Sequence, residues 1–554
     1  MCELKARPPI LFRDVTVNYP DNLVATVRYA SGNGAPTGAC LVPVMKAGNG
    51  RWKRAPGFQL NCCDVRVGNG HMARTVGLSW PAGVKRALLF LFHCQIEKAG
   101  DPAFALPPEV RTHGSSREAL IAAAFTSLPQ GDLGRGVLDA AVLGIPPEEA
   151  AVPHQISFAL ASCQYPAGIF DGGVRTDDRD LDERHLGPAE LSLWGLAARC
   201  ETDPSIRFSV FCGDQVYVDA TAGLFDSRFL LDGLATAYQL RDANKGWQRL
   251  GRLARNRYCV IDDHEIVDNW EPMPAGGKRD DVDDRLVPGV VRYVGEQRVP
   301  QWPTHFVMPY VRFKALYDAR NVCGLDFFFT DTRTERDGRT VFNYDCSRIM
   351  STGQEQCLDG WLEAMAAKRA GGTRKNALPA FIASPSILLP RRLATAREAE
   401  MALYSDAWDG YPSSLYAVLA KLFQYRAQRV IFLSGDEHLS CVARITLTRD
   451  GSNEEIVAHS VHSSALYAPY PFANSVEADF PADDRFDFTH DGYTYQCRVE
   501  TEFPRPGDGF AVLSVRGDQT CRQVFVDFDR CVGQREIFEL CCCGPMSRSS
   551  ASAS

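Results

Sequence analysis

The amino-acid sequence predicts an α/β protein that carries an all-β domain at its N-terminus. Between residues 9 and 100, short apolar segments such as LVATVRYA and VKRALLFLFHC are separated by the turn sequences GNG, GNGAP and PAG. This spacing is typical of an immunoglobulin-like β-sandwich. After residue 155, strand-like apolar runs alternate with helical stretches such as AELSLWGLAARC and SSLYAVLAKLFQYRAQ, which is the pattern of βα units. A chain of 554 residues also exceeds what one hydrophobic core normally serves, so more than one domain is expected.

Changes in composition along the chain predict four segments. Residues 1–100 form the β-sandwich, and residues 101–153, which are rich in Pro and Ala, form a connector with short helices. Residues 154–545 form the α/β domain, whose strand-like runs continue almost to the end of the chain. The last segment, 546–554, is rich in Ser and Ala and is expected to be disordered.

Composition and charge disfavour several classes of protein. Hydrophobic residues at 45 % and charged residues at 23 % are ordinary values for a globular protein. A net charge of −8 disfavours nucleic-acid binding. No stretch reaches the ~20 apolar residues that a membrane span needs, and the N-terminus lacks a signal-peptide pattern. The 19 cysteines are odd in number, and several lie within apolar runs, which favours reduced thiols and a cytoplasmic protein. Cys541, Cys542 and Cys543 form either a partly exposed strand end or a site of acylation or metal binding.

Four apolar, β-prone runs end in residues that can bind metal ions. The runs are ISFALASC at 156–163, RFSVFCGDQVY at 207–217, RYCVIDDHE at 257–265 and VIFLSGDEH at 430–438. Because the carboxyl ends of strands in an open α/β sheet converge on one edge, we expect the side chains at these ends to meet. The expected group comprises Cys163, Asp214, Tyr217, Asp262, Asp263, His264, Asp436 and His438. This pattern predicts a metal-dependent hydrolase.

Each motif also has an ordinary structural interpretation. Asp214 follows a glycine at a strand end and can bridge two cations. Tyr217 supplies a phenolate ligand or belongs to the core. The acidic run that begins at Asp262 surrounds a cation or forms a solvated turn. Asp436 and His438 are two residues apart, so in an extended chain they point the same way and can bind one ion. The coincidence of four such strand ends favours the metal-site interpretation.

Six short motifs together resemble a known enzyme family. They are Ser162-Cys163-Gln164, Gly213-Asp214-Gln215-Val216-Tyr217, Asp262-Asp263-His264-Glu265, Asp331-Thr332-Arg333, Trp408-Asp409-Gly410-Tyr411 and Gly435-Asp436-Glu437-His438. In type and order they resemble the PhoD-like phosphatases, the alkaline phosphatase D branch of the calcineurin-like metallophosphoesterases, over roughly residues 155–480. The resemblance implies a four-layer αββα catalytic domain, and a β-sandwich ahead of it also fits the family.

The resemblance further implies which residues hold metal ions. The implied ligands are Cys163, Asp214, Tyr217, Asp263, Asp436 and His438. The first three would hold a ferric ion, with one of the last two nearby, and Asp263 would bind a second cation, calcium, with Asp214 between the metals. The centre would be dinuclear or trinuclear, and Mg, Mn or Zn could replace these ions in the cytosol. His264 would lie near the leaving group, and Asn269 is an outer-ligand candidate.

The predicted reaction is hydrolysis of a small phosphate ester at a dinuclear site, where a water activated by the cations attacks phosphorus in line. Asp263, His264 and Arg333 form the expected catalytic set. His264 would protonate the leaving group, and Arg333 would bind phosphate oxygens or pair with Asp331. Two alternatives stay open: a phospholipase-D-type diesterase acting on a lipid or a small diester, and a metal-stabilised scaffold protein without turnover. The physiological substrate, the preference for mono- or diesters and the oligomeric state are not determined by the sequence.

Overall fold

The computed structural model describes eight strands among the first 150 residues and most of the chain from residue 155 on. The described residues of this later part are 155–166, 188–219, 237–238, 240–251, 253, 256–272, 316–369, 378–463, 465–469, 475–517, 522–530, 535–541 and 546–551. The chain divides into two compact units, one of Met1–Ala150 with Trp247–Asn256 and one of Ala151–Gly246 with Arg257–Ser554. The expected domain boundaries stay a prediction.

The described part of the first unit contains two antiparallel sheets. Its strands are β1 (Phe12–Asn18), β2 (Val24–Tyr29), β3 (Thr37–Lys46), β4 (Trp52–Arg54), β5 (Asn61–Val65), β6 (Arg74–Ser79), β7 (Arg86–Phe92) and β8 (Val137–Gly144). One sheet has the order β1-β2-β6, and the other has the order β4-β3-β7-β8 with β5 also paired to β3. The strand β8 lies in the segment that was expected to be a connector with short helices. Its Ala-rich sequence suggests a helix, but pairing with β7 overrides that weak local preference.

The second unit contains two sheets, and the first is built around β9. Its strands are β9 (Gln155–Gln164), β10 (Ile206–Cys212), β11 (Asn256–Val260), β18 (Ala465–Tyr467), β21 (Gly509–Gly517), β22 (Arg522–Arg530), β23 (Arg535–Glu539) and β24 (Ser547–Ala551). They follow the order β11-β10-β9-β21-β22-β23-β24, with β18 also paired to β9. The strands β9 and β10 are parallel, so both end at one edge. The strand β24 lies in the tail that was expected to be disordered, where it pairs antiparallel with β23.

The second sheet has a parallel centre and antiparallel margins. Its strands are β12 (Asp318–Val322), β13 (Leu325–Phe329), β14 (Ala380–Ala383), β15 (Val430–Ser434), β16 (Cys441–Arg449), β17 (Ile456–His462), β19 (Asp483–His490) and β20 (Tyr493–Glu502). The order is β12-β13-β14-β15-β17-β16-β20-β19. The four strands β13, β14, β15 and β17 run parallel, so their carboxyl ends also share one edge.

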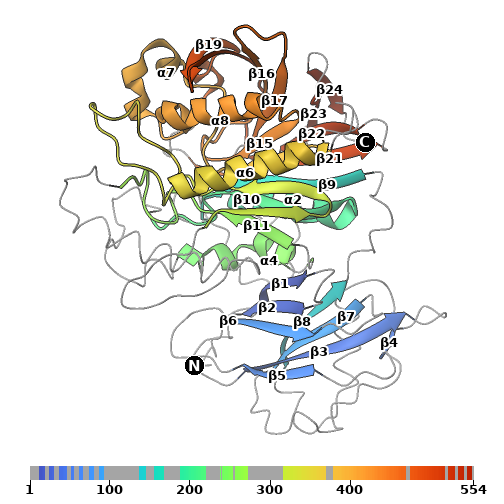
Figure 1. Cartoon of the computed structure of the whole chain (residues 1–554). Helices are drawn as coiled ribbons and strands as arrows, with labels where there is room; N and C mark the ends of the chain where they lie inside the picture. The colour runs from blue at the N-terminus through green and yellow to red at the C-terminus, as the bar shows by residue number, and fades with distance from the viewer. Residues whose placement is uncertain are drawn as a thin grey trace. The chain divides into compact units, whose positions relative to one another are not determined.

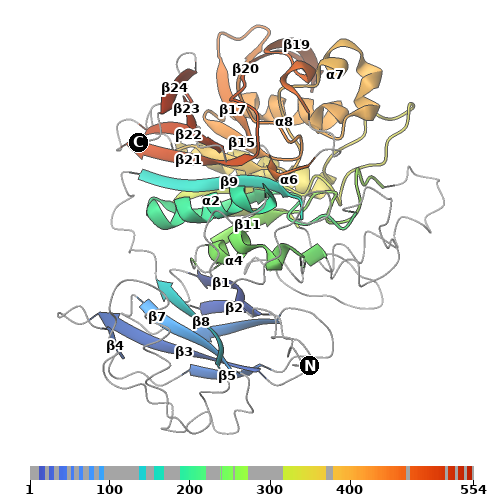
Figure 2. The same ribbon diagram turned by 180° about the vertical axis from the view of Figure 1, so that it is seen from behind.

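Helices flank these two sheets. Among the described residues, the α-helices of this unit are α2 (Pro188–Thr202), α6 (Thr352–Arg369), α7 (Leu393–Arg397) and α8 (Pro412–Gln424), and the 3-10 helices are η3 (Ala399–Tyr404), η4 (Trp408–Gly410) and η5 (Glu477–Asp479). Most of a further helix, α4 (Lys245–Gly251), belongs to the first unit. The helices α6 and α8 lie side by side over the second sheet (Figure 1). The helix α2 runs along the first sheet beside β9, as the view from behind shows (Figure 2). Within the described ranges, no helix combines the length and the apolar character that crossing a bilayer requires.

Two large hydrophobic cores pack the described part of the second unit. Between the sheets, the rings of Phe158 and Phe208 stack with centroids 5.0 Å apart, and Phe327 stacks on Phe381 at 4.9 Å. On the other face of the second sheet, Phe328 packs in the core that α6 and α8 cover. Neighbouring residues of β13 therefore enter different cores, as the alternation of side chains along a strand requires. The prediction of a mixed α/β protein is confirmed.

Candidate metal centre

The strand ends of the second unit bring the predicted ligands together. Cys163 is the penultimate residue of β9, and Asp214, Asp262 and Asp436 each lie two residues beyond the ends of β10, β11 and β15. Three groups of side chains have ligand atoms within 4.8 Å of one another: Cys163 with Asp214 and His438; Asp214 with Asp263 and His264; and Asp214 with Asp262, Asp263 and Asp436. Asp214 belongs to all three groups, so it occupies the centre of the cluster.

Two glycines allow the strand ends to approach so closely. Gly213 has a φ of 88°, and a Cβ built on it would lie 2.6 Å from the Cβ of Asp262. A Cβ on Gly435 would lie 2.3 Å from the Cβ of Ser162 and 2.5 Å from the carbonyl oxygen of Cys212. Neither contact is tolerable, so only glycine fits at these two positions. Gly213 is therefore required by packing between the ends of neighbouring strands, and Gly435 by packing between the ends of strands from the two sheets.

Four of the candidate ligands have an unusual backbone conformation. The φ angles of Cys163, Asp214, Asp436 and His438 are 51°, 52°, 90° and 52°. Left-handed backbone is uncommon for residues other than glycine, and it concentrates at functional sites where the surrounding structure enforces it. This strain is consistent with side chains that are held in place for a ligand.

Glu265 joins two of the strand-end loops. Its carboxylate accepts backbone N–H groups of Asp214 at 3.2 Å, Gln215 at 2.7 Å and Asp262 at 2.9 Å. Burial raises the pKa of Glu265 to about 8, although these backbone hydrogen bonds oppose the shift. The sequence analysis quoted this residue within its motif but assigned it no role. In the structure, Glu265 holds these two loops together through its hydrogen bonds.

Several carboxyl oxygens in the cluster have no hydrogen-bond partner although they are buried. They are Oδ1 of Asp214, Oδ2 of Asp262 and Oδ1 of Asp263. Burial raises the pKa of Asp214 and of Asp436 well above the ordinary value, and neighbouring carboxylates add to the shift in both. Buried anions without partners are costly, and a bound cation removes that cost. The residues present therefore fit metal ions.

A thiol, a phenol and an imidazole lie on one side of Asp214. The Cys163 thiol donates to Oδ2 of Asp214 at 3.4 Å, and the Tyr217 hydroxyl lies 3.3 Å from Nε2 of His438. Burial raises the pKa of both Cys163 and Tyr217 well above the ordinary values. A thiolate or phenolate would thus form here only against a cation, and the pair suits a ferric or softer metal.

His264 is oriented by a residue that the sequence analysis missed. Its Nδ1 donates to Oδ1 of Asp219 at 2.8 Å, and the other oxygen of Asp219 accepts the N–H of Asp268 at 2.5 Å. Burial alone lowers the pKa of His264, but Asp219, Asp263 and Asp214 raise it overall. Asp219 lies in a turn two residues beyond the ligand candidate Tyr217. That nearness in the chain is the signal by which the residue could have been found.

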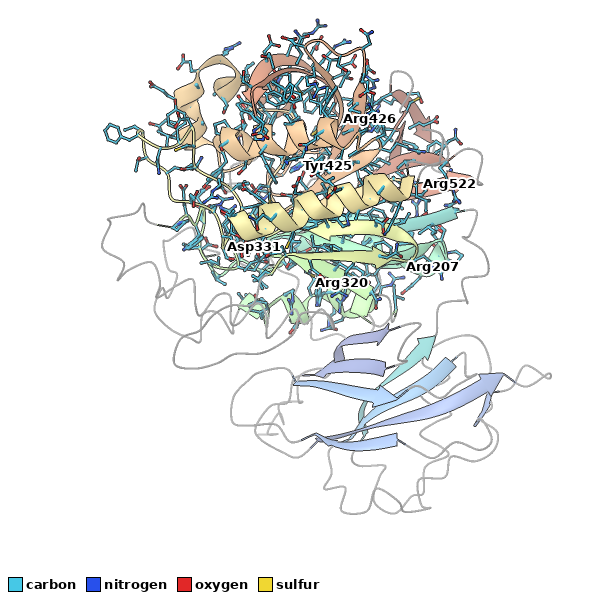
Figure 3. The ribbon with its side chains drawn as sticks, viewed as in Figure 1. Arg207, Arg320, Asp331, Tyr425, Arg426 and Arg522 are labelled. Carbon is cyan, nitrogen blue, oxygen red and sulfur yellow. The ribbon has the colours of Figure 1, made fainter. Side chains whose placement is uncertain are left out.

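Arg333 lies deep in the protein and contacts acidic side chains. Its Nε donates to Asp262 Oδ1 at 2.8 Å, and Nη2 lies 2.6 Å from that same oxygen and 2.5 Å from Asp406 Oδ2. Asp331, one of its expected partners, accepts the backbone N–H groups of Arg333 and Thr334 and the hydroxyl of Thr334. Asp331 lies beside the N-terminal end of α6 (Figure 3), where its backbone pairs with Gln354. The guanidinium therefore pairs with Asp262 and Asp406 rather than with Asp331.

The fold and the clustered ligand groups together define a protein of the metal-dependent α/β class. The family model for PhoD-like phosphatase matches residues 191–502, more than half of the chain. The chain belongs to the PhoD-like phosphatase family, which the sequence motifs had indicated. A solved structure described as "Structure of PhoD" superposes with a TM-score of 0.61, covering 99 % of this chain and 93 % of that chain at 13 % sequence identity. At that identity the likeness shows a shared fold. No curated protein matches the sequence.

Proposed function

We propose that this PhoD-like phosphatase hydrolyses small phosphate esters at a dinuclear metal centre bridged by Asp214. The observation that carries the proposal is that Asp214 belongs to all three groups of candidate ligands and keeps one buried oxygen without a partner. A carboxylate in that position can share its two oxygens between two cations. The four-layer αββα arrangement, with a β-sandwich ahead of it, completes the proposed architecture.

The two sides of Asp214 differ in donor chemistry. Cys163, His438 and Tyr217 would hold one cation on the side where sulfur, imidazole and phenol meet. A ferric ion suits this set, and zinc is the alternative. Asp263 and Asp436 would hold the second cation with oxygen donors only. Calcium, magnesium or manganese suits that side.

The cations, when bound, supply Lewis-acid activation of water and neutralise charge on the phosphoryl oxygens. The protein contributes proton transfer and orientation. His264 holds a proton on a ring that Asp219 orients, so its Nε2 can donate to the leaving oxygen. Arg333 is best explained as a positioning residue, because its guanidinium fixes Asp262 and has no exposed surface from which to reach a phosphate.

A metal-stabilised scaffold without turnover is the less favoured alternative. Unpaired buried carboxylates destabilise the metal-free fold, so a protein that kept only the scaffold would gain by losing them. A phosphodiesterase acting on a lipid or a small diester uses the same centre. The distinction between monoesters and diesters therefore depends on the substrate pocket, which the metal ligands alone do not define.

The test compares hydrolysis of bis(p-nitrophenyl) phosphate and p-nitrophenyl phosphate by protein reconstituted with Fe, Ca, Mg, Mn or Zn. An Asp214→Asn variant, which keeps the shape but removes the bridging charge, is assayed in parallel. We expect kcat to fall at least ~10³-fold in the variant, because stabilisation of transition-state charge depends on the centre. The ratio of diester to monoester turnover assigns the substrate class.

Bound metal, measured in the same samples, separates the alternatives. Turnover that disappears together with one metal equivalent in the variant supports the dinuclear enzyme. Wild-type protein that retains stoichiometric metal but hydrolyses neither ester faster than the variant would instead favour the scaffold. Equal turnover by wild type and variant would contradict the assignment of Asp214.

A further inference from the structure

Two large apolar side chains project from the loop that follows β13. Val341 is 65 % exposed and Phe342 is 92 % exposed, and they are adjacent at the tip of a turn. A phenylalanine with most of its surface in water is unfavourable, and a scattered exposed residue would not normally have an equally exposed apolar neighbour. We name Val341 and Phe342 the hydrophobic apex.

The turn below the hydrophobic apex is held by its own polar groups. The backbone N–H and the hydroxyl of Thr340 both donate to Oδ1 of Asn343, at 2.6 and 2.8 Å. The Asn343 amide donates to the carbonyl of Gly338 at 3.1 Å, and the N–H of Phe342 donates to the Thr340 hydroxyl at 3.2 Å. These bonds do not use the apolar side chains at the apex. The turn therefore presents those side chains in a fixed geometry, which lowers the entropy lost when they are buried by a partner.

Arg339 fixes the base of the turn to neighbouring loops. Its guanidinium forms a bidentate pair with Glu271, at 3.0 and 2.8 Å. Its Nη1 also donates to the carbonyls of Ala402, Ser405 and Gly410 at 2.8 to 2.9 Å. Tyr404, which is 81 % exposed, lies between the first two of these carbonyls in the chain. Glu271 directly follows Trp270, whose carbonyl accepts from Arg333, the residue that pairs with Asp262 of the site. The apex is thus anchored to a loop of the site.

Charges around the apex are balanced. Among the described residues of the loop, Arg336 pairs with Asp406, Arg339 with Glu271, and Arg348 with Asp337. Anionic membranes attract clusters of lysine and arginine that lack acidic partners. The loop offers no such cluster, so attraction to anionic headgroups is not expected to drive binding here.

We propose that the hydrophobic apex docks this protein on a lipid surface with uncharged or zwitterionic headgroups. A stable protein partner normally covers ~800 Å² on each side, which two side chains on a narrow turn cannot provide. Insertion of two apolar side chains into the acyl boundary suits this shape. The exposed Tyr404, in a segment that Arg339 ties to the base of the turn, suits the interfacial region. Docking would be reversible, because single apolar anchors bind membranes weakly. The proposal concerns binding alone and does not depend on the proposed reaction.

The test is sedimentation of the full-length protein with phosphatidylcholine vesicles. A double variant, Val341→Ser with Phe342→Ser, removes the apex from an exposed turn whose hydrogen bonds involve no apolar side chain. We expect its partition coefficient to fall at least ~10-fold relative to wild type. Tyr493→Ser, at a side chain that is 52 % exposed on β20, is the matched control and should bind like wild type. A Phe342→Trp variant should show a blue-shifted emission on addition of vesicles.

Salt and self-association complete the test. Binding that persists in high salt supports apolar docking, as does equal or weaker binding to vesicles that contain phosphatidylserine. Equal binding of wild type and the double variant overturns the proposal, and so does the absence of any blue shift in Phe342→Trp. Binding only to anionic vesicles, abolished by salt, also overturns it. A lipid-free dimer that the double variant loses would assign the apex to a second copy of the chain instead.

Discussion

Two groups of acidic side chains lie at the same edge of the sheets, yet they differ in what balances their charge. In the metal centre, Asp214 and Asp436 lie together, and no arginine of the described residues forms an ion pair with either. Asp263 lies between the two groups, with its Oδ1 3.6 Å from Nη2 of Arg333. In the neighbouring cluster, Asp406 pairs with both Arg333 and Arg336. Arginine side chains balance the charge of the group around Asp406, whereas the group around Asp214 needs a bound cation to balance its charge. Clustered carboxylates alone are therefore a weak sign of a metal site. Clustered carboxylates that are not paired with arginine or lysine side chains are a stronger sign.

The pKa shifts of the two groups have opposite signs for this reason. Burial raises the pKa of Asp214 and of Asp436. Burial also opposes ionisation of Asp406, but Arg333 and Arg336 overcome it and lower the pKa of that carboxyl to about 2. Asp262 belongs to both groups. One of its oxygens pairs with Arg333 while the other has no partner, and burial raises its pKa to about 7 against the effect of Arg333.

The largest expected effect comes from breaking the balanced group. An Arg333→Met variant keeps the volume of the side chain but leaves Asp262 and Asp406 without their shared cation. Because removing one partner of a buried ion pair strands the other charge, we expect a loss of about 3–5 kcal/mol in the free energy of unfolding. Urea denaturation of the metal-free protein, followed by the fluorescence of its tryptophans, measures this loss.

Arg348→Met is the matched control for that variant. Arg348 pairs with Asp337, but the two side chains are 39 % and 45 % exposed, so the same substitution should cost less than about 1 kcal/mol. Equal urea midpoints for the two variants would contradict the distinction between a buried charge network and a surface pair.

A smaller effect is expected from the residue that orients His264. An Asp219→Asn variant keeps a hydrogen-bond acceptor for the imidazole but removes the adjacent negative charge. Loss of such a supporting carboxylate typically costs ~10- to 100-fold in activity. Because Asp219 raises the pKa of His264, the variant should lose its general acid at lower pH. The descending limb of kcat against pH should therefore move to lower pH.

The amount of bound metal in Asp219→Asn distinguishes two roles for His264, a general acid and a metal ligand. If it is the acid, Asp219→Asn retains the metal content of wild type while its pH profile moves. A fall in metal content without a moved profile would contradict the acid role. Asp268→Asn is the control, because the Asp268 carboxylate lies 3.8 Å from the other ring nitrogen and is 59 % exposed. We expect it to change kcat by less than Asp219→Asn, because exposed charges are screened by solvent.

The sequence predicted that the candidate ligands would lie close together, because each of them follows a recognisable strand. The runs that lead to Cys163, Asp214 and His438 are apolar and short. The strands β9 and β10 are parallel and end at one edge of the first sheet, and β15 of the second sheet ends beside them. The Gly-Asp pairs added a second signal, since close approach of strands at Gly213 and Gly435 needs glycine. Pattern and topology thus sufficed to group these residues.

Other features depended on contacts that no local pattern encodes. Asp406 lies 73 residues beyond Arg333 in a loop, and only the fold shows that they pair. For the same reason the sequence offered Asp331 as a partner for Arg333, since nearness in the chain was the available guide. The sequence predicts a connector with short helices where β8 lies. Its pairing partner β7 is more than 40 residues away in the chain, so no local pattern indicates the strand. Both features depend on contacts between residues that are far apart in the sequence.

A further prediction tests the comparison through the pH dependence of the free energy of unfolding of the metal-free protein. Asp262 and Glu265 have ordinary pKa values of 3.8 and 4.5, which the fold raises to about 7 and about 8. A carboxyl group with a raised pKa stabilises the fold while it is protonated, and this contribution is lost as pH rises through the raised value. Asp406 has the opposite sign, because its lowered pKa favours the fold above pH ~4 and is lost only as pH falls toward about 2. Between about pH 5 and pH 8, the carboxyl groups at the metal centre therefore determine how stability changes with pH, and we expect the Tm of the metal-free protein to fall by on the order of 5 °C.

Added Mn²⁺ should reverse this fall in Tm, since the ion replaces the missing counter-charge, and Asp214→Asn should make it smaller. A metal-free Tm that stays constant or rises across this range would show that the carboxylates of the centre are balanced by the protein after all.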